Sequence, residues 1–298
     1  MLTWSDYLSF ILFVAFIGIV PSFAAALTSP CNGKTGSTVC KLVWSSNGLE
    51  GFKSSNVDVH QAHSGVHDVV CTLLPETDIF SNGNKTLKIS YLGKKNGLKQ
   101  TCYTYIYNLI NPANRNDNHG YVEATILIKN DLGLNELNPQ SWPAFWLTVL
   151  DKKDEKNGPD AWPKFGEIDI AEGLGNTNQT STNLHGDENA QGIYAINGIQ
   201  IGKLASLGLY DNNHYHIYGL EWELLNNSVI LNIYYDDIFQ YSTVGDATQK
   251  PYFQIKKGLQ SGKMILIFDT DQGPEPSFND AIRYSMTVSN VNVYSIAS

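Results

Sequence analysis

Three carboxylic acids fall within one short stretch of the chain, Glu167, Asp169 and Glu172, and the residues between them are isoleucine or alanine. This alternation indicates a β-strand, in which successive side chains point to opposite faces, so Glu167 and Asp169 share a face. Plain alternation would turn Glu172 the other way, but one extra residue in a β-bulge would return it. Two such acids, with carboxyl groups about 5–5.5 Å apart, can cleave a glycosidic bond with retention of configuration. Neighbouring carboxylates raise one pKa, which keeps one acid protonated beside an anionic partner.

The alternative interpretation is a solvated edge strand whose acids serve solubility. The flanking sequence disfavours it, because Trp162, Phe165 and Gly166 precede the acids and Gly173 follows them. An aromatic, glycine-rich setting is less typical of a solvated edge strand than of a catalytic site, so we take the catalytic interpretation as the leading one.

The elements that must position these acids are strands. Short segments rich in β-branched and aromatic residues recur between Gly, Asn and Asp, and none has a long helical period. The segments are residues 85–92, 121–128, 144–149, 167–171, 215–222, 229–235, 264–268 and 286–294. Many short strands separated by turns predict an all-β sandwich or barrel.

The first 26 residues are interpreted as a secretory signal peptide. Residues 8–20 are apolar, Pro21 interrupts the run, and small residues at 24–26 suit cleavage, although the start carries Asp6 and no Lys or Arg. A retained membrane anchor is the alternative, which the shortness of the run disfavours. We therefore predict a secreted protein, extracellular or in a cell wall, with a single domain over residues 27–298.

Four cysteines follow the leader, Cys31, Cys40, Cys71 and Cys102. An even count in a secreted chain favours two disulfides, and three connectivities are open. Proximity alone favours Cys31–Cys40 and Cys71–Cys102. Three triplets fit the acceptor pattern for N-glycosylation, beginning at Asn84, Asn178 and Asn226.

The charge of the chain bears on its partners. Removal of the leader takes away Asp6 and no basic residue, which changes the formal net charge from −9 to about −8. A mildly acidic protein is unsuited to nucleic acid or to an anionic membrane, both of which require basic patches. We expect a neutral polymer as the partner, no membrane association after removal of the leader, and a monomer.

Residues 121–294 resemble glycoside hydrolase family 16, most closely its laminarinase-like endo-β-1,3-glucanases of fungal type. The resemblance rests on the acid motif and on five further segments: Trp142-Pro143-Ala144-Phe145-Trp146-Leu147, Trp162-Pro163, Asn183-Leu184-His185, the strand that ends in Glu221-Trp222, and residues 285–294, which resemble the last strand of the family. It implies a β-jelly-roll sandwich of two antiparallel sheets with a concave substrate cleft. It also implies Glu167 as nucleophile, Glu172 as general acid/base and Asp169 as the helper between them.

The resemblance further implies residues that bind substrate. Sugar rings have apolar C–H faces, so a glycan cleft needs flat aromatic platforms. Trp162 and His185 stand at the family positions for substrate contact, and Trp146 and Trp222 are further candidates. Trp142 is interpreted as structural. Asp269 and Asp271 are open to three interpretations: lining the cleft, binding calcium or forming a turn.

We predict no metal and no cofactor. The family's last strand often carries an Asp associated with a structural calcium ion, and this chain has Ser289 and Asn290 there, which disfavours calcium without closing the alternative. The predicted function is a secreted retaining endo-β-glucanase for β-1,3- or mixed β-1,3/1,4-glucan. Two alternatives stay open: a cell-wall glucan transglycosylase, and a non-catalytic glucan-recognition protein on the same fold.

Overall fold

The computed structural model describes residues 29–31, 40–46, 57–61, 69–70, 80–81, 86–92, 94–95, 98–100, 102–106, 118–131, 141–149, 166–173, 180–186, 199–203, 214–261, 264–272 and 283–297. The leader at 1–26, Trp162, Asn84, Asn178 and Cys71 lie outside these ranges, so the expectations that concern them stay predictions. No helix of the described residues is long and apolar enough to cross a membrane.

Sheet A contains eight antiparallel strands and forms one layer of the molecule. Its order is β16 (Ile238–Asp246), β15 (Ser228–Tyr235), β14 (His216–Leu224), β9 (His119–Asn130), β18 (Tyr284–Ile296), β5 (Thr86–Tyr91) and β4 (Phe80–Ser81), and β1 (Cys40–Ser45) also pairs with β18.

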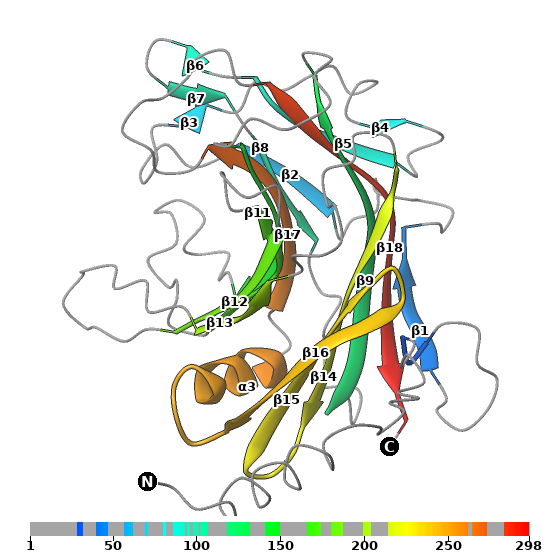
Figure 1. The fold of residues 1–298 in the computed structure, drawn as a ribbon, viewed down its shortest axis with the longest axis vertical. Helices are drawn as coiled ribbons and strands as arrows, with labels where there is room; N and C mark the ends of the chain where they lie inside the picture. The colour runs from blue at the N-terminus through cyan, green and yellow to red at the C-terminus, as the bar shows by residue number, and fades with distance from the viewer. Residues whose placement is uncertain are drawn as a thin grey trace, which may run out of the picture.

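Sheet B contains seven antiparallel strands and forms the second layer. Its order is β13 (Ile199–Lys203), β12 (Thr180–His185), β11 (Glu167–Gly173), β10 (Ser141–Val149), β17 (Met264–Gln272), β8 (Cys102–Ile106) and β2 (Val57–Gln61). The sheet is strongly bent, and its hollow side faces away from sheet A (Figure 1). A small third sheet joins β3 (Val69–Val70), β7 (Leu98–Gln100) and β6 (Lys94–Lys95).

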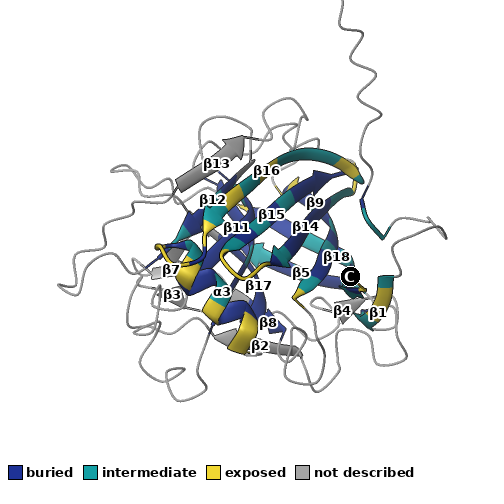
Figure 2. Cartoon of the chain, turned by 90° about the horizontal axis from the view of Figure 1, so that it is seen from below, coloured by how far each residue is buried: buried dark blue, intermediate teal, exposed yellow. Residues whose placement is uncertain are grey.

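The core lies between the two large sheets. Both contribute alternate residues to one apolar cluster, such as Phe145 and Leu147 from β10 and Val122 and Leu220 from sheet A. Figure 2 shows buried residues along the central strands, with exposed positions on β1, β16 and α3 (Tyr252–Ser261). The predicted jelly-roll sandwich of two antiparallel sheets is confirmed, and each of the eight predicted segments overlaps a strand.

Helix α3 was not predicted. It has only ten residues, and its buried residues are Gln254, Ile255, Gly258 and Leu259, of which only two are large and apolar. A stripe this short gives little helical period, and the helix packs against strands of both layers, on β15, β16 and β17.

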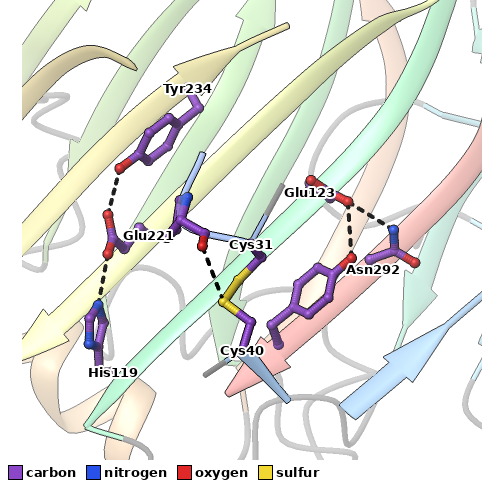
Figure 3. Close-up of a disulfide and its surroundings, with 9 residues drawn as sticks. Cys31, Cys40, His119, Glu123, Glu221, Tyr234 and Asn292 are labelled. Atoms are coloured by element: carbon purple, nitrogen blue, oxygen red, sulfur yellow. Dashed lines mark hydrogen bonds and ion pairs between the residues drawn. A yellow bond between two sulfur atoms is a disulfide. The ribbon is translucent and has the colours of Figure 1, made fainter. Parts of the chain in front are cut away.

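The disulfide Cys31–Cys40 is present, as predicted. It joins the segment before β1 to β1 itself and packs on the outer face of sheet A with Tyr121, Tyr234 and Ile296. Figure 3 shows the disulfide in one view with Glu221 of β14, whose carboxylate accepts a hydrogen bond from the Tyr234 hydroxyl and pairs with His119. The pairing of Cys71 with Cys102 remains a prediction.

Candidate active site

The predicted β-bulge lies within the acid motif. On one side Trp146 pairs with Asp169 while Phe145 pairs with Ala171, which leaves Ile170 as the extra residue of β11. On the other side the register shifts between Asp169 and Glu172 as well. Ile168, Ile170 and Ala171 all belong to the core cluster. The three acids therefore share the opposite face, which is the hollow side of sheet B.

Burial is unusual for these acids. Glu167 is 6% and Asp169 is 2% exposed. Carboxylates this far from water require partners, because an isolated buried charge costs many kcal/mol. Each partner found here comes from a strand that neighbours β11.

His185 supplies the nearest cationic partner. It pairs directly with Glu167 across the β11–β12 ladder. Its Nε2 atom lies 2.9 Å from Oδ2 of Asp169 and 3.7 Å from Oε1 of Glu167. Burial opposes protonation of this imidazole, but the contact with Asp169 and the charges of Asp169 and Glu172 raise its pKa above the usual value.

The acids keep protons to a higher pH than isolated carboxyl groups do. Burial, the charges of Asp169 and Glu172, and a hydrogen bond with Asp169 raise the pKa of Glu167 well above its usual value. Burial and the charge of Asp169 raise the pKa of Glu172 to about 7, against hydrogen bonds that lower it. Like charges confined together cannot all ionise, so the cluster retains a proton near neutral pH.

Those opposing hydrogen bonds come from both neighbouring strands. The Trp142 indole Nε1 donates to Oε1 of Glu172 at 2.8 Å, and the Asn183 amide Nδ2 donates to Oε2 at 2.7 Å. Trp142 lies on β10 and Asn183 on β12, so the Glu172 carboxyl is held from each side.

A fourth carboxylate lies one strand further on. Asp269 on β17 is 4% exposed, and its Oδ2 accepts a hydrogen bond from Trp146 Nε1 at 2.6 Å. Ala144 pairs with Glu172 on one side and with Asp269 on the other. The charge of Asp269 also raises the pKa of Glu167, by less than burial, Asp169 and Glu172 do.

Helix α3 fixes the backbone beside two of these residues. Gly166, which precedes Glu167, has φ +80°, and a Cβ there would lie 2.7 Å from the Ile255 backbone nitrogen. Gly186, which follows His185, lies against Gln254 and Pro251 at the start of α3. Glycine at both positions lets α3 approach the ends of β11 and β12 that carry Glu167 and His185.

The structure places the predicted residues unequally. Glu167, Asp169, Glu172 and His185 come together, and Trp146 lies beside Asp169 on the same face. Trp162 lies outside the described residues. The prediction for Trp222 was wrong: it is 2% exposed in the core of sheet A, packed over Gly120, where no substrate can stack on it.

Three residues of the site were missed or undecided. Trp142, interpreted as structural, contacts Glu172. The sequence does indicate this placement, because Trp142 and Trp146 are four residues apart on one strand and their side chains therefore point to the same face. Asn183 shares parity with His185 in the same way. Asp269 lies within a strand and not in a turn, which removes one of its three interpretations.

One cluster of the described residues could hold a metal ion by distance alone. Ligand atoms of Glu167, Asp169 and His185 lie within 4.8 Å of one another. Within this cluster the His185 nitrogen already lies at ion-pair distance from Asp169, at 2.9 Å. Neither a metal ion nor a cofactor enters the chemistry proposed below.

No protein-family model matches the chain, and no curated protein matches it in sequence. Solved structures do match. An endo-1,3-β-glucanase from Streptomyces sioyaensis is 18% identical, with a TM-score of 0.59 over 82% of this chain and 90% of that one. A non-specific endo-β-1,3(4)-glucanase from family GH16 is 18% identical, with a TM-score of 0.57 over 86% and 94%. β-Agarase A from Zobellia galactanivorans is 16% identical, with a TM-score of 0.54 over 90% and 99%. The chain thus has the jelly-roll fold of these glycoside hydrolases.

Proposed function

We propose that this protein is a retaining endo-β-glucanase that hydrolyses β-1,3- or mixed β-1,3/1,4-glucan. The observation that carries the proposal is the bulge at Ile170, which puts Glu167, Asp169 and Glu172 on the hollow face of sheet B. The glucanase neighbours share the fold, and the sequence resemblance supplies the laminarinase-like type. We further propose that the protein is secreted, on the basis of its apolar leader, and acts as a monomer.

In the first step, Glu167 attacks the anomeric carbon while Glu172 donates its proton to the leaving oxygen. In the second, Glu172 takes a proton from water, which then displaces the sugar from Glu167. A pKa of about 7 suits Glu172 to both roles near neutral pH. Glu167 must be anionic to attack. Its surroundings favour the protonated form, so Glu167 has to lose its proton before the first step. The imidazole of His185, whose Nε2 atom lies 3.7 Å from Oε1 of Glu167, stabilises the anion when the imidazole is protonated.

Substrate recognition is assigned to aromatic residues near the acids. Trp146 is half-buried beside Asp169, and its indole is held by Asp269, which suits a fixed platform for one sugar ring. Trp162 is proposed as a second platform from the sequence resemblance alone.

A glucan transglycosylase is the second candidate. It would use the same covalent intermediate with a sugar acceptor in place of water. The longer acid motif, with its extra residue, favours hydrolysis. A non-catalytic glucan-recognition protein is the third candidate, and the presence of all three acids disfavours it.

The test is product analysis on β-1,3-glucan, mixed-linkage glucan and xyloglucan, with an acceptor oligosaccharide present. Shortened products from the first two, released initially as the β-anomer, are expected. Lengthened products would identify a transferase instead, and binding without products would identify a recognition protein. Glu167→Gln should lower the rate by several orders of magnitude, and an unchanged rate would exclude Glu167 as nucleophile.

A further inference from the structure

We propose that Trp142 and Asn183 are positioning residues that clamp the Glu172 carboxyl group from both sides and control when it gives up its proton. This proposal rests on the function proposed above, in which Glu172 is the acid/base. It concerns two residues that were not predicted to take part in catalysis.

The geometry of the clamp is specific. Ala144 and Ser181 pair with Glu172 on its two sides, and the clamping side chains come from positions two residues away, Trp142 on β10 and Asn183 on β12. Each donates to a different carboxyl oxygen, at 2.8 Å and 2.7 Å. Two donors on separate oxygens fix the plane of the carboxyl group, which one donor cannot do.

Both donors also favour the anionic form of Glu172. An N–H group can donate to a carboxylate but cannot accept its proton, so each hydrogen bond opposes protonation. Burial and the charge of Asp169 act in the opposite direction. Without the clamp, burial and the charge of Asp169 would keep Glu172 protonated through neutral pH. The clamp offsets these two effects, and Glu172 can then act as a base in the second step.

The other titratable groups that face this carboxyl are few among the described residues. Glu167 and Asp169 lie on the same strand, His185 lies on β12, and Asp269 lies across Ala144 on β17. None of them is altered in the variants below, so a shift in the titration of Glu172 reports on the clamp.

The clamp is tested directly by NMR. The Trp142 indole N–H signal, assigned by its loss in Trp142→Phe, is followed against pH. It should titrate with a midpoint near the pKa of Glu172, about 7. This titration should vanish in Glu172→Gln, and in Asn183→Ala its midpoint should rise by about one pH unit.

A matched control exists in sheet A. Asn232 Nδ2 donates to Oε2 of the buried Glu221 at 2.8 Å, so Asn232→Ala removes the same kind of hydrogen bond far from the site. It should leave the Trp142 midpoint unchanged. An unchanged midpoint in Asn183→Ala as well would overturn the proposal.

Kinetics provide the second readout. The alkaline limb of kcat/KM on β-1,3-glucan should move to higher pH in Trp142→Phe and in Asn183→Ala, and further in the double variant. The loss of glycosylation rate that the two variants show on β-1,3-glucan should be much smaller on an aryl β-glucoside, because the leaving group of that substrate needs no protonation. Equal losses on both substrates would assign the two residues a merely structural role. If the wild-type protein cleaves no glucan, the proposed function fails, and the NMR titration still decides whether the clamp exists.

Discussion

His185 on β12 stands directly opposite Glu167 on β11, and its Nε2 atom reaches both Oε1 of Glu167 and Oδ2 of Asp169, at 3.7 Å and 2.9 Å. One imidazole thus faces two of the three acids. The charge of His185 also lowers the pKa of Glu172, against burial and Asp169, which raise it. The histidine is therefore placed to tune the whole acid cluster.

Replacement of His185 by Gln should lower kcat on β-1,3-glucan by about 10–100-fold. It should also move the alkaline limb of the pH profile upward, because a positive charge that lowers the pKa of Glu172 is lost. The matched control is His216→Gln, since His216 Nδ1 lies 2.9 Å from Asp236 Oδ2 in another histidine–aspartate pair on sheet A. A change of the same size in the control would contradict a specific role for His185.

Deletion of Ala171 should preserve the fold. Phe145 would then pair with Ile170, both ladders of β11 would become regular, and Glu172 would stay on the hollow face. We expect an intact circular dichroism spectrum and glucan cleavage reduced by no more than about 100-fold.

Insertion of one alanine after Ala171 is the opposing change. It should turn Glu172 toward the core and bury a carboxylate without partners, which abolishes activity and costs several kcal/mol of stability. A deletion variant that unfolds while the insertion variant remains stable would contradict the assigned register.

Asp269→Asn keeps a hydrogen-bond acceptor for Trp146 but removes a negative charge. Because that charge contributes to the raised pKa of Glu167, the acidic limb of the pH profile should move to lower pH. The KM for glucan should change little, since the indole stays in place. Asp269→Leu, which removes the acceptor too, should raise KM several-fold. Asp131→Asn serves as the control, because Asp131, just after β9, also accepts a side-chain hydrogen bond, from Ser285 Oγ. An acidic limb that stays in place in Asp269→Asn would refute the electrostatic role.

The ionisation of Glu221 should make the free energy of unfolding depend on pH. Although burial opposes it, hydrogen bonds with His119, Asn232 and Tyr234 lower the pKa of Glu221 in the folded protein below its usual value near 4.5. A lowered pKa stabilises the fold above the unfolded value, and this contribution is lost as pH falls below about 4.5 toward the folded value. In urea unfolding, Glu221→Gln should cost about 1–3 kcal/mol at pH 7 and progressively less at lower pH. A cost that does not depend on pH would contradict this linkage.

The strands and the convergence of the three acids on one face could be predicted from the sequence, for a physical reason. Alternation of apolar residues is written into each strand, and the count from Glu167 to Glu172 itself requires a bulge if the acids are to meet. Trp222 could not be placed in this way. In a strand that is buried on both faces, the sequence pattern does not show which side chains point toward the core between the sheets. Glu221 and Trp222 are both buried, on opposite faces of β14. The partners of Glu172 depend on which strands neighbour β11, and that order follows from long-range pairing that no local pattern encodes.

The segment tied down by Cys31–Cys40 rests on sheet A, where the Ser29 backbone N–H donates to the Asp237 carbonyl in the turn after β15. The acids face outward from the opposite layer. A protein immobilised through residues just before Ser29 would thus present its hollow face to the bulk liquid. Insoluble glucan particles could then be brought to a support-bound form without the support blocking the reacting groups.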